Sequence, residues 1–373
     1  MERVASELTG TPRRPAPASG GNPLALPAVR GRASDGGPLA LPAARGHTSA
    51  ALLGALREPP HHLPPIVLPD GDDPLADEDL QLALYLCYEL HYRGLPGVDE
   101  RWEWSPSLLA LREALETRFE AALRGAVAPA GPPPAPEGFD VALRAIADAD
   151  TSPSLSRHIE RAATLEQVRE FLIHRSAYQL KEADPHSWAI PRLSGAPKAA
   201  LVEIQADEYG GGRPERMHAR LFADTLEALG VDARYGAYLE RLPAATLATV
   251  NVMSLFGLHR RLRGALVGHL ALFEMTSSIP NRRYADGLRR LGCDSRAATH
   301  FFDEHVTADA VHEAVAAVDL AGGLARQEPQ LAEDILWGAN ALVEIEGRWA
   351  RALLDAWRQG GSSLLPAAVP APA

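Results

Sequence analysis

Apolar residues recur along most of the chain at intervals of three and four residues, the spacing that gives an α-helix one buried face. Runs that alternate between apolar and polar residues, as half-buried strands do, are nearly absent. The pattern predicts helices at residues 76–93, 106–124, 164–183, 197–209, 214–229, 243–259, 261–276, 297–319 and 327–358. Short connections rich in Gly and Pro favour an all-α, bundle-like fold.

Residues typical of helix starts support three of these segments. Asp77 is a candidate cap for the first helix, and Ser105 stands before Pro106 at the start of the second. The sequence Thr164-x-x-Gln167 has the form of a capping box, in which each side chain bonds to the backbone of the other residue.

The helical pattern has interruptions that divide the chain. Residues 1–66 are rich in Pro, Ala, Gly and Arg, lack a usable periodicity and predict a disordered N-terminal arm. A helical hairpin is expected at residues 67–125, a Pro-rich linker or loop at 126–137, and the main helical domain at 138–359. Residues 360–373 are expected to form a flexible tail.

Composition narrows the classes of partner and compartment. The net charge is -11, with +3 in residues 1–65 and -14 in the rest, which argues against nucleic acid as the main partner. No apolar run approaches the about 20 residues that span a bilayer, and no secretory leader is recognised. Cys87 and Cys293 form no CxxC pair, as expected for a protein of the reducing cytoplasm. Residues 23–31 recur at 38–46, too few copies for a solenoid.

Candidate metal ligands lie in the segment 297–319. His305, Asp309 and His312 are spaced at i, i+4 and i+7, so a helix places them on one stripe. Two imidazoles and a carboxylate in an apolar helix suit a transition metal. The same spacing also fits a solvated polar face or packed histidines.

Glu274 is a carboxylate in a segment that is apolar nearly all round. Burying it bare costs several kcal/mol, so it needs a metal ion or a cationic partner. The arginines at positions 260, 261 and 263 keep an ion pair open as the alternative.

Glu208 and His218 flank a run of three glycines. In an unbroken helix they would be about 80° apart around the axis and ~15 Å apart along it. Gly210 to Gly212 and Pro214 forbid an unbroken helix, and a kinked segment would let both side chains point inward. An ordinary turn between helices explains the same residues. The neighbouring acids Glu203, Asp207 and Glu304 are expected to be outer or surface groups.

Taken together, these residues resemble the haem-oxygenase-like diiron oxidases and oxygenases, in the branch of the iron-containing redox enzymes. The segments that carry the resemblance are Gln205–Gly210, Gly268–Ser278 and His305–Glu313, and it covers roughly residues 70–358. It implies a haem-oxygenase-like helical bundle that holds two iron ions, Fe(II) or Fe(III), with O2 as co-substrate. Glu182 alone would be a solvated residue at a helix end, but it matches the early acid of the family.

The resemblance also implies the roles of single residues. The expected metal ligands are Glu182, Glu208, His218, Glu274, His305, Asp309 and His312, with Glu208, Glu274 and Asp309 as the catalytic carboxylates. The family is known for a mobile helix that carries ligands and loads iron poorly. The glycines at 210–212 give a physical reason for such mobility here.

The function implied is O2-dependent oxidation of a small organic substrate, by N-oxygenation, desaturation or oxidative C–C cleavage. An external electron donor and a homodimer are possible partners, and Mn(II) is a possible replacement for one iron. Arg282, Arg283 and Tyr284 either bind a substrate carboxylate or form a solvated loop. The alternatives are a non-catalytic helical metal-binding or interaction protein and a cofactor-independent oxidase or hydrolase of the same fold. In a further alternative a side chain such as Tyr209 is itself the substrate.

Overall fold

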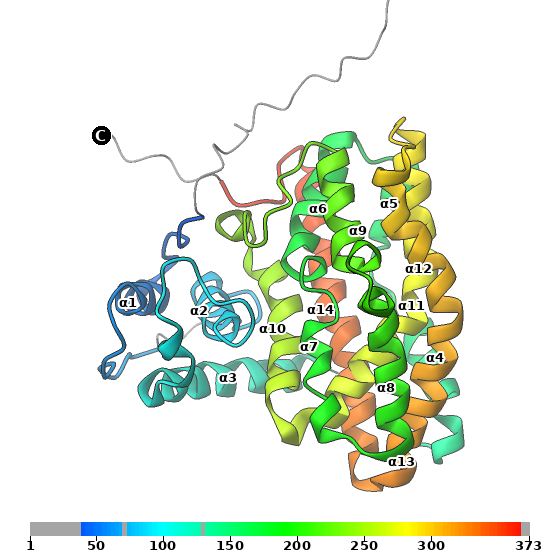
Figure 1. Cartoon of the computed structure of the whole chain (residues 1–373), viewed down its shortest axis with the longest axis horizontal. Coiled ribbons are helices and arrows are strands. Elements are labelled where there is room, and N and C mark those ends of the chain that lie inside the picture. The colour runs from blue at the N-terminus through cyan, green and yellow to red at the C-terminus, as the bar shows by residue number, and fades with distance from the viewer. Residues whose placement is uncertain (1–38, 69–72, 128–130, 367–373) are drawn as a thin grey trace, which may run out of the picture. The chain divides into compact units, whose positions relative to one another are not determined.

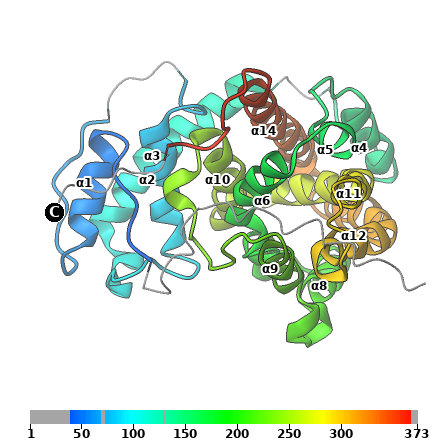
Figure 2. The same ribbon diagram turned by 90° about the horizontal axis from the view of Figure 1, so that it is seen from above.

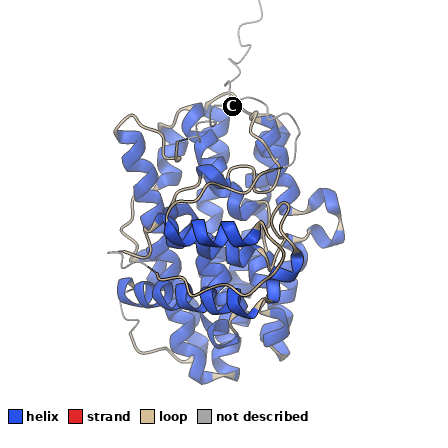
Figure 3. Ribbon diagram, turned by 90° about the vertical axis from the view of Figure 1, so that its left-hand side faces the viewer, coloured by secondary structure: helices blue, strands red, loops and turns tan. Residues whose placement is uncertain are grey.

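The computed structural model describes residues 39–68, 73–127 and 131–366, and within these ranges the side chains of 308–311 are not described. Every regular element in these ranges is a helix and none is a strand (Figure 3), which confirms the all-α prediction. None of the described helices has an apolar stretch long enough to cross a bilayer.

The elements follow one another as helices joined by short turns. The α-helices are α1 (His47–Leu56), α2 (Glu78–Glu89), α3 (Pro106–Ala126), α4 (Phe139–Asp148), α5 (Leu155–Arg161), α6 (Leu165–Gln179), α7 (Asp184–Ser187), α8 (Gly195–Glu208), α9 (His218–Ala228), α10 (Ala244–Leu258), α11 (Arg263–Arg290), α12 (Arg296–Ala314), α13 (Gly323–Gln327) and α14 (Ala332–Arg358). A π-helix, η8 (Val315–Gly322), joins α12 to α13. The 3-10 turns are η1 (Glu100–Trp104), η2 (Pro136–Gly138), η3 (Ile190–Arg192), η4 (Gly210–Gly212), η5 (Pro214–Arg216), η6 (Leu239–Arg241), η7 (Arg260–Leu262) and η9 (Pro329–Leu331).

The long helix α11 is the centre of the bundle. It packs along α14 and α12 and also contacts α5, and α9 in turn packs on α12. Figure 1 shows α6, α9, α11, α12 and α14 running in similar directions, and α9, α11 and α12 are seen nearly end-on in Figure 2. The helices α1 and α2 form a layer at one side, where α2 packs on α10.

Within the described ranges, the segments nearest the two chain ends form more structure than the sequence indicated. The prediction of disorder through residue 66 is wrong for α1, whose residues Leu52, Leu53 and Leu56 are buried. Asp79 of α2 accepts hydrogen bonds from the first backbone amides of α1, so this short helix depends on a partner distant in sequence. In the predicted tail, Ser363 donates a hydrogen bond to Glu170. Residues 1–38 and 367–373 lie outside the described part.

Helix boundaries differ from the predictions where tertiary contacts decide them. The expected end near residue 276, before Pro280, is wrong, because α11 continues to Arg290. Proline removes one backbone donor, while Ala285 and Leu288 beyond it still bury apolar surface. The cap at Asp77 and the capping box at Thr164 are confirmed.

Candidate metal centre

Six of the seven predicted ligands converge on two adjoining groups in the core. The first group consists of Glu182, Glu208, His218 and His305, and the second of Glu208, Glu274 and His312. Within each group the candidate ligand atoms all lie within 4.8 Å of one another, and all six residues are buried. Glu208 belongs to both groups. Asp309 lies within α12, but its side chain is outside the described residues.

A break between two helices brings Glu208 and His218 together. Glu208 is the last residue of α8 and His218 the first of α9, and the three glycines between them all have positive φ. A Cβ on Gly210 would lie 2.6 Å from the backbone carbon of Arg216, so only glycine fits there. The Glu208 Oε2 and His218 Nδ1 atoms are 2.9 Å apart. The kinked geometry suggested by the glycines is therefore present.

Glu182 lies in a turn between α6 and α7, not at the end of a longer helix. The predicted helix to residue 183 is wrong, because α6 ends at Gln179. Ala183 has a left-handed backbone with φ 73°, a conformation that costs a non-glycine residue roughly 1–2 kcal/mol. Such a strained residue persists only where the surrounding contacts hold the turn.

The contacts that hold this turn come from the N-terminal helix α2 and the residues after it. Lys181 Nζ forms a 2.8 Å ion pair with Glu89, and both side chains are at most 2% exposed. The Tyr235 hydroxyl donates a 2.5 Å hydrogen bond to Glu89, and the Lys181 ammonium lies 4.1 Å from the ring centre of Tyr92. Arg93 donates to the carbonyl of residue 180 at 2.8 Å. Sequence reasoning missed this pair, although Glu89 in an apolar helix gives the same signal as Glu274.

The helix α12 presents His305 to the first group and His312 to the second. His305 Nδ1 donates to the Phe301 carbonyl at 2.7 Å, so Nε2 faces Glu182 at 3.5 Å. His312 Nδ1 lies 3.3 Å from Glu274 Oε2. Its Nε2 lies 3.2 Å from Asp207, which was expected to be an outer residue and is half exposed.

Charges in the two groups shift the pKa values of their members. Burial raises the pKa of Glu182. Burial alone would also raise the pKa of Glu208, but the adjacent His218 outweighs it and lowers that pKa to about 2. Burial would lower the pKa of His312, yet its contact with Glu274 raises it to about 9. The centre therefore balances carboxylates against imidazoles among buried side chains.

Several buried polar atoms of the centre have no hydrogen bond within the described residues, although some lie close to one another. They are Oε2 of Glu182, Oε2 of Glu208, Nδ1 of His218 and Nδ1 of His312. Unsatisfied buried groups are rare and costly in folded proteins, and here they converge on one place. A cavity of about 10 Å³ is bordered by Glu182 and Glu208 of this set, and also by His186, which sequence reasoning missed. Mixed carboxylate and imidazole donors fit iron, so the residues present fit the metal that the resemblance implies.

Two of the three arginines considered as partners of Glu274 are engaged elsewhere, and the third, Arg260, is exposed. Arg263 pairs with Glu328 and Arg261 with Glu120, whereas Glu274 faces His312. These arginines therefore do not form the ion pair with Glu274 that was considered as an alternative.

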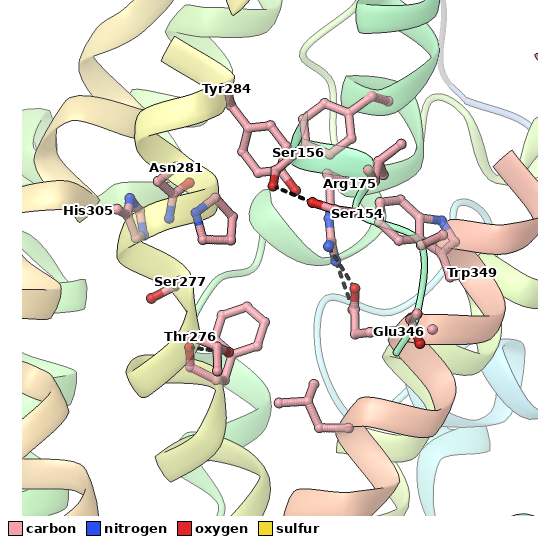
Figure 4. A pocket seen from close by; sticks show the side chains of 18 of the residues that line it. Ser154, Ser156, Arg175, Thr276, Ser277, Asn281, Tyr284, His305, Glu346 and Trp349 are labelled. Carbon is pink, nitrogen blue, oxygen red and sulfur yellow. Dashed lines mark hydrogen bonds and ion pairs between the residues drawn. The ribbon is translucent and has the colours of Figure 1, made fainter. Parts of the chain in front are cut away.

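A second and larger cavity, of about 250 Å³, opens beside the first group (Figure 4). Glu182 and His305 form part of its wall. Tyr284 also lines it, and together with Arg282 and Arg283 belongs to α11, so the loop expected for these three residues is absent. Arg283 donates to Ser156 and Arg282 is exposed.

The comparisons with known proteins agree with this class of all-α protein with a buried carboxylate and imidazole centre. Residues 169–347, which hold all seven predicted ligands, match the model of the iron-containing redox enzyme family. A nitrosourea synthase from Streptomyces achromogenes subsp. streptozoticus is 29% identical over 153 residues. The match covers 41% of this chain and 31% of that relative.

Proposed function

We propose that the protein is a non-haem diiron oxidase or oxygenase, which uses O2 to oxidise a small organic substrate. The observation that carries the proposal is the pair of buried ligand groups that share Glu208. A single structural ion would need only one of these groups. The match of residues 169–347 to the model of a family of iron-containing redox enzymes supports the same function.

The residues divide between two ions in a simple way. Glu182, His218 and His305 would hold one iron, Glu274 and His312 would hold the other, and Glu208 would serve both. Asp309 joins the second set on its sequence pattern alone. When bound, two ferrous ions supply O2 with electrons jointly, which a single ferrous ion does less readily.

The chain's own residues provide the surroundings that this chemistry needs. The Phe301 carbonyl fixes the ring and tautomer of His305, so that Nε2 is the atom offered to the centre. The six ligand side chains are buried, which excludes water from the reacting groups. The large cavity would hold the substrate next to Glu182 and His305.

The type of oxidation stays within three outcomes: N-oxygenation, desaturation and oxidative C–C cleavage. The name of the similar nitrosourea synthase supports N-oxygenation among them. We further propose that an external electron donor completes the reaction and that the partner is a small molecule.

Anaerobic titration with Fe(II), followed by exposure to O2 in a stopped-flow absorbance experiment, tests this proposal. The full chain should bind two irons and show a transient visible absorption that His305→Ala and Glu274→Ala abolish. His300→Ala is a matched control, since His300 lies on the same helix outside both groups and should leave both results unchanged. An absence of iron uptake would contradict the proposal. Iron uptake without O2 consumption in the presence of reductant would instead indicate a metal-binding protein.

A further inference from the structure

The large cavity has two polar stripes that face each other. Arg175, Gln179 and Glu182 lie at i, i+4 and i+7 along α6 and the turn after it. Ser277, Asn281 and Tyr284 have the same spacing on α11. Figure 4 shows Asn281 on the same side of the cavity as His305, with the Arg175–Glu346 pair farther across.

Two amide side chains of this lining lack partners. Asn281 is only 9% exposed, and its carboxamide makes no hydrogen bond within the described part of the chain. Gln179 Oε1 is buried and likewise has none. A ligand that hydrogen-bonds to these amides supplies partners that the described side chains do not. Both amides can donate and accept, but neither carries a charge.

Apart from Asp150, the charged groups of the described lining are already paired, Arg175 with Glu346 and His305 with Glu182. Arg175 donates two hydrogen bonds to Glu346, of 2.9 and 2.7 Å, and its guanidinium lies 4.0 Å from the ring centre of Trp349. A ligand carboxylate would have to displace Glu346 or Glu182, and a ligand cation would have to displace Arg175 or His305. Either exchange leaves one buried charge without its partner. Asp150 is exposed at the rim and also repels anions.

Beyond these groups and a few hydroxyl side chains, much of the lining is apolar and rich in aromatic rings. Phe171 packs against Tyr284, with ring centres 4.6 Å apart, and Tyr284 contacts Phe302 at 5.6 Å. Such a surface suits an apolar or aromatic body. At about 250 Å³, the cavity lies just below the roughly 300–1,000 Å³ typical of ligand pockets, so the ligand must be small.

We propose that this cavity selects an uncharged small molecule, with an apolar or aromatic body and one neutral hydrogen-bonding group that Gln179 and Asn281 bind. Carboxamides, ureas and alcohols share this chemistry. That the ligand is the oxidised substrate rests on the proposed function. The binding preference itself does not depend on iron.

Isothermal titration calorimetry with three probes of equal body tests the preference: phenylpropanamide, phenylpropanoate and phenylpropylamine. The full chain without metal should bind the amide about tenfold more tightly than the acid or the amine, as one well-placed hydrogen bond corresponds to about a tenfold change. Gln179→Leu and Asn281→Leu should each weaken amide binding by a similar factor. Asn340→Leu, on α14 outside the cavity, should have no effect.

A second substitution guards against misfolded variants. Asn281→Asp keeps the shape of the side chain and adds a negative charge, so it should reverse the preference towards phenylpropylamine. Tighter binding of the acid or the amine by the unmodified chain would overturn the inference, as would indifference of amide binding to all three substitutions. If the amide binds as expected but iron is not taken up, the proposed function fails and the neutral-ligand site stands.

Discussion

The two ligand groups share Glu208 but are built in different ways. The second group adds Glu274 and His312, which lie in the interiors of the long helices α11 and α12. The first group takes Glu182 from a turn and His218 from the start of a helix after a glycine break. One group thus depends on helix periodicity and the other on turns held from outside. We therefore expect the loss of distant contacts to disturb the geometry of the first group more than that of the second.

The largest effect on iron binding is expected for Glu208, the residue that both groups share. Glu208→Ala removes a donor from both groups and should reduce iron binding from two ions per chain to nearly none, measured by ferrous titration with chelator assay. Glu203→Ala is the matched control, because Glu203 is exposed on the same helix. Retention of one tightly bound iron by the Glu208 variant would show that the groups are independent.

A smaller effect, on stability and on iron affinity, should distinguish the first group from the second. Glu89→Gln leaves Lys181 buried without its ion-pair partner, which costs roughly 3–5 kcal/mol. The urea midpoint of the metal-free variant should fall accordingly, and iron affinity should fall at the first group while the second still loads.

Pairing Glu89→Gln with Lys181→Met provides the control for that experiment, since it removes the buried charge altogether. Stability should largely recover, whereas the loss of affinity at the first group should remain if the ion pair positions Glu182. Full recovery of both would reduce the pair to a purely structural role.

The glycine break offers a finer test. Gly210→Ala combines a positive φ with a clash against the backbone of Arg216, and a cost of about 2–3 kcal/mol is expected. Gly211→Ala has a similar φ but no atom within 4 Å, so only the strain of about 1 kcal/mol remains. The difference in unfolding free energy between the two variants measures the close approach. Equal values would show that the segment relaxes.

A further test concerns pH and the second group. In the metal-free protein, Glu274 raises the pKa of His312 to about 9, above its ordinary value of 6.5. The stabilisation is therefore complete below pH 6.5 and is lost as pH rises through about 9. The unfolding free energy of the unmodified chain should decrease over this window relative to His312→Gln. Parallel pH curves for the two proteins would contradict the assignment.

Local sequence patterns predicted most of the helices and several of the residues that form the site. The helices of the bundle follow from the spacing of apolar residues, and the caps at Asp77 and Thr164 follow from the residue types at helix starts. The convergence of Glu208 with His218 follows from the glycines between them. Periodicity also brought out His305 and His312, because both lie on one helical stripe.

Features that depend on a distant partner were not predictable in this way. The helix α1 forms in a stretch that reads as disorder, because its buried leucines and its cap at Asp79 need α2. The run of α11 through Pro280 and the turn at Glu182 likewise reflect tertiary packing. Nothing local in the sequence pairs Glu89 with Lys181, which are far apart along the chain.

The glycines of α11 have a mechanical consequence. A Cβ on Gly268 would fall 1.7 Å from the carbonyl oxygen of Ile335, and one on Gly338 would fall 2.0 Å from that of Ala265, so the backbones of α11 and α14 touch. Gly287 approaches the backbone of α5 in the same manner. The helix α11, which carries Glu274, is thus held near both ends by close backbone contacts with α14 and α5. A shift of α11 on metal binding would disrupt these backbone contacts, so we expect the centre to adjust through α8 and α9 instead.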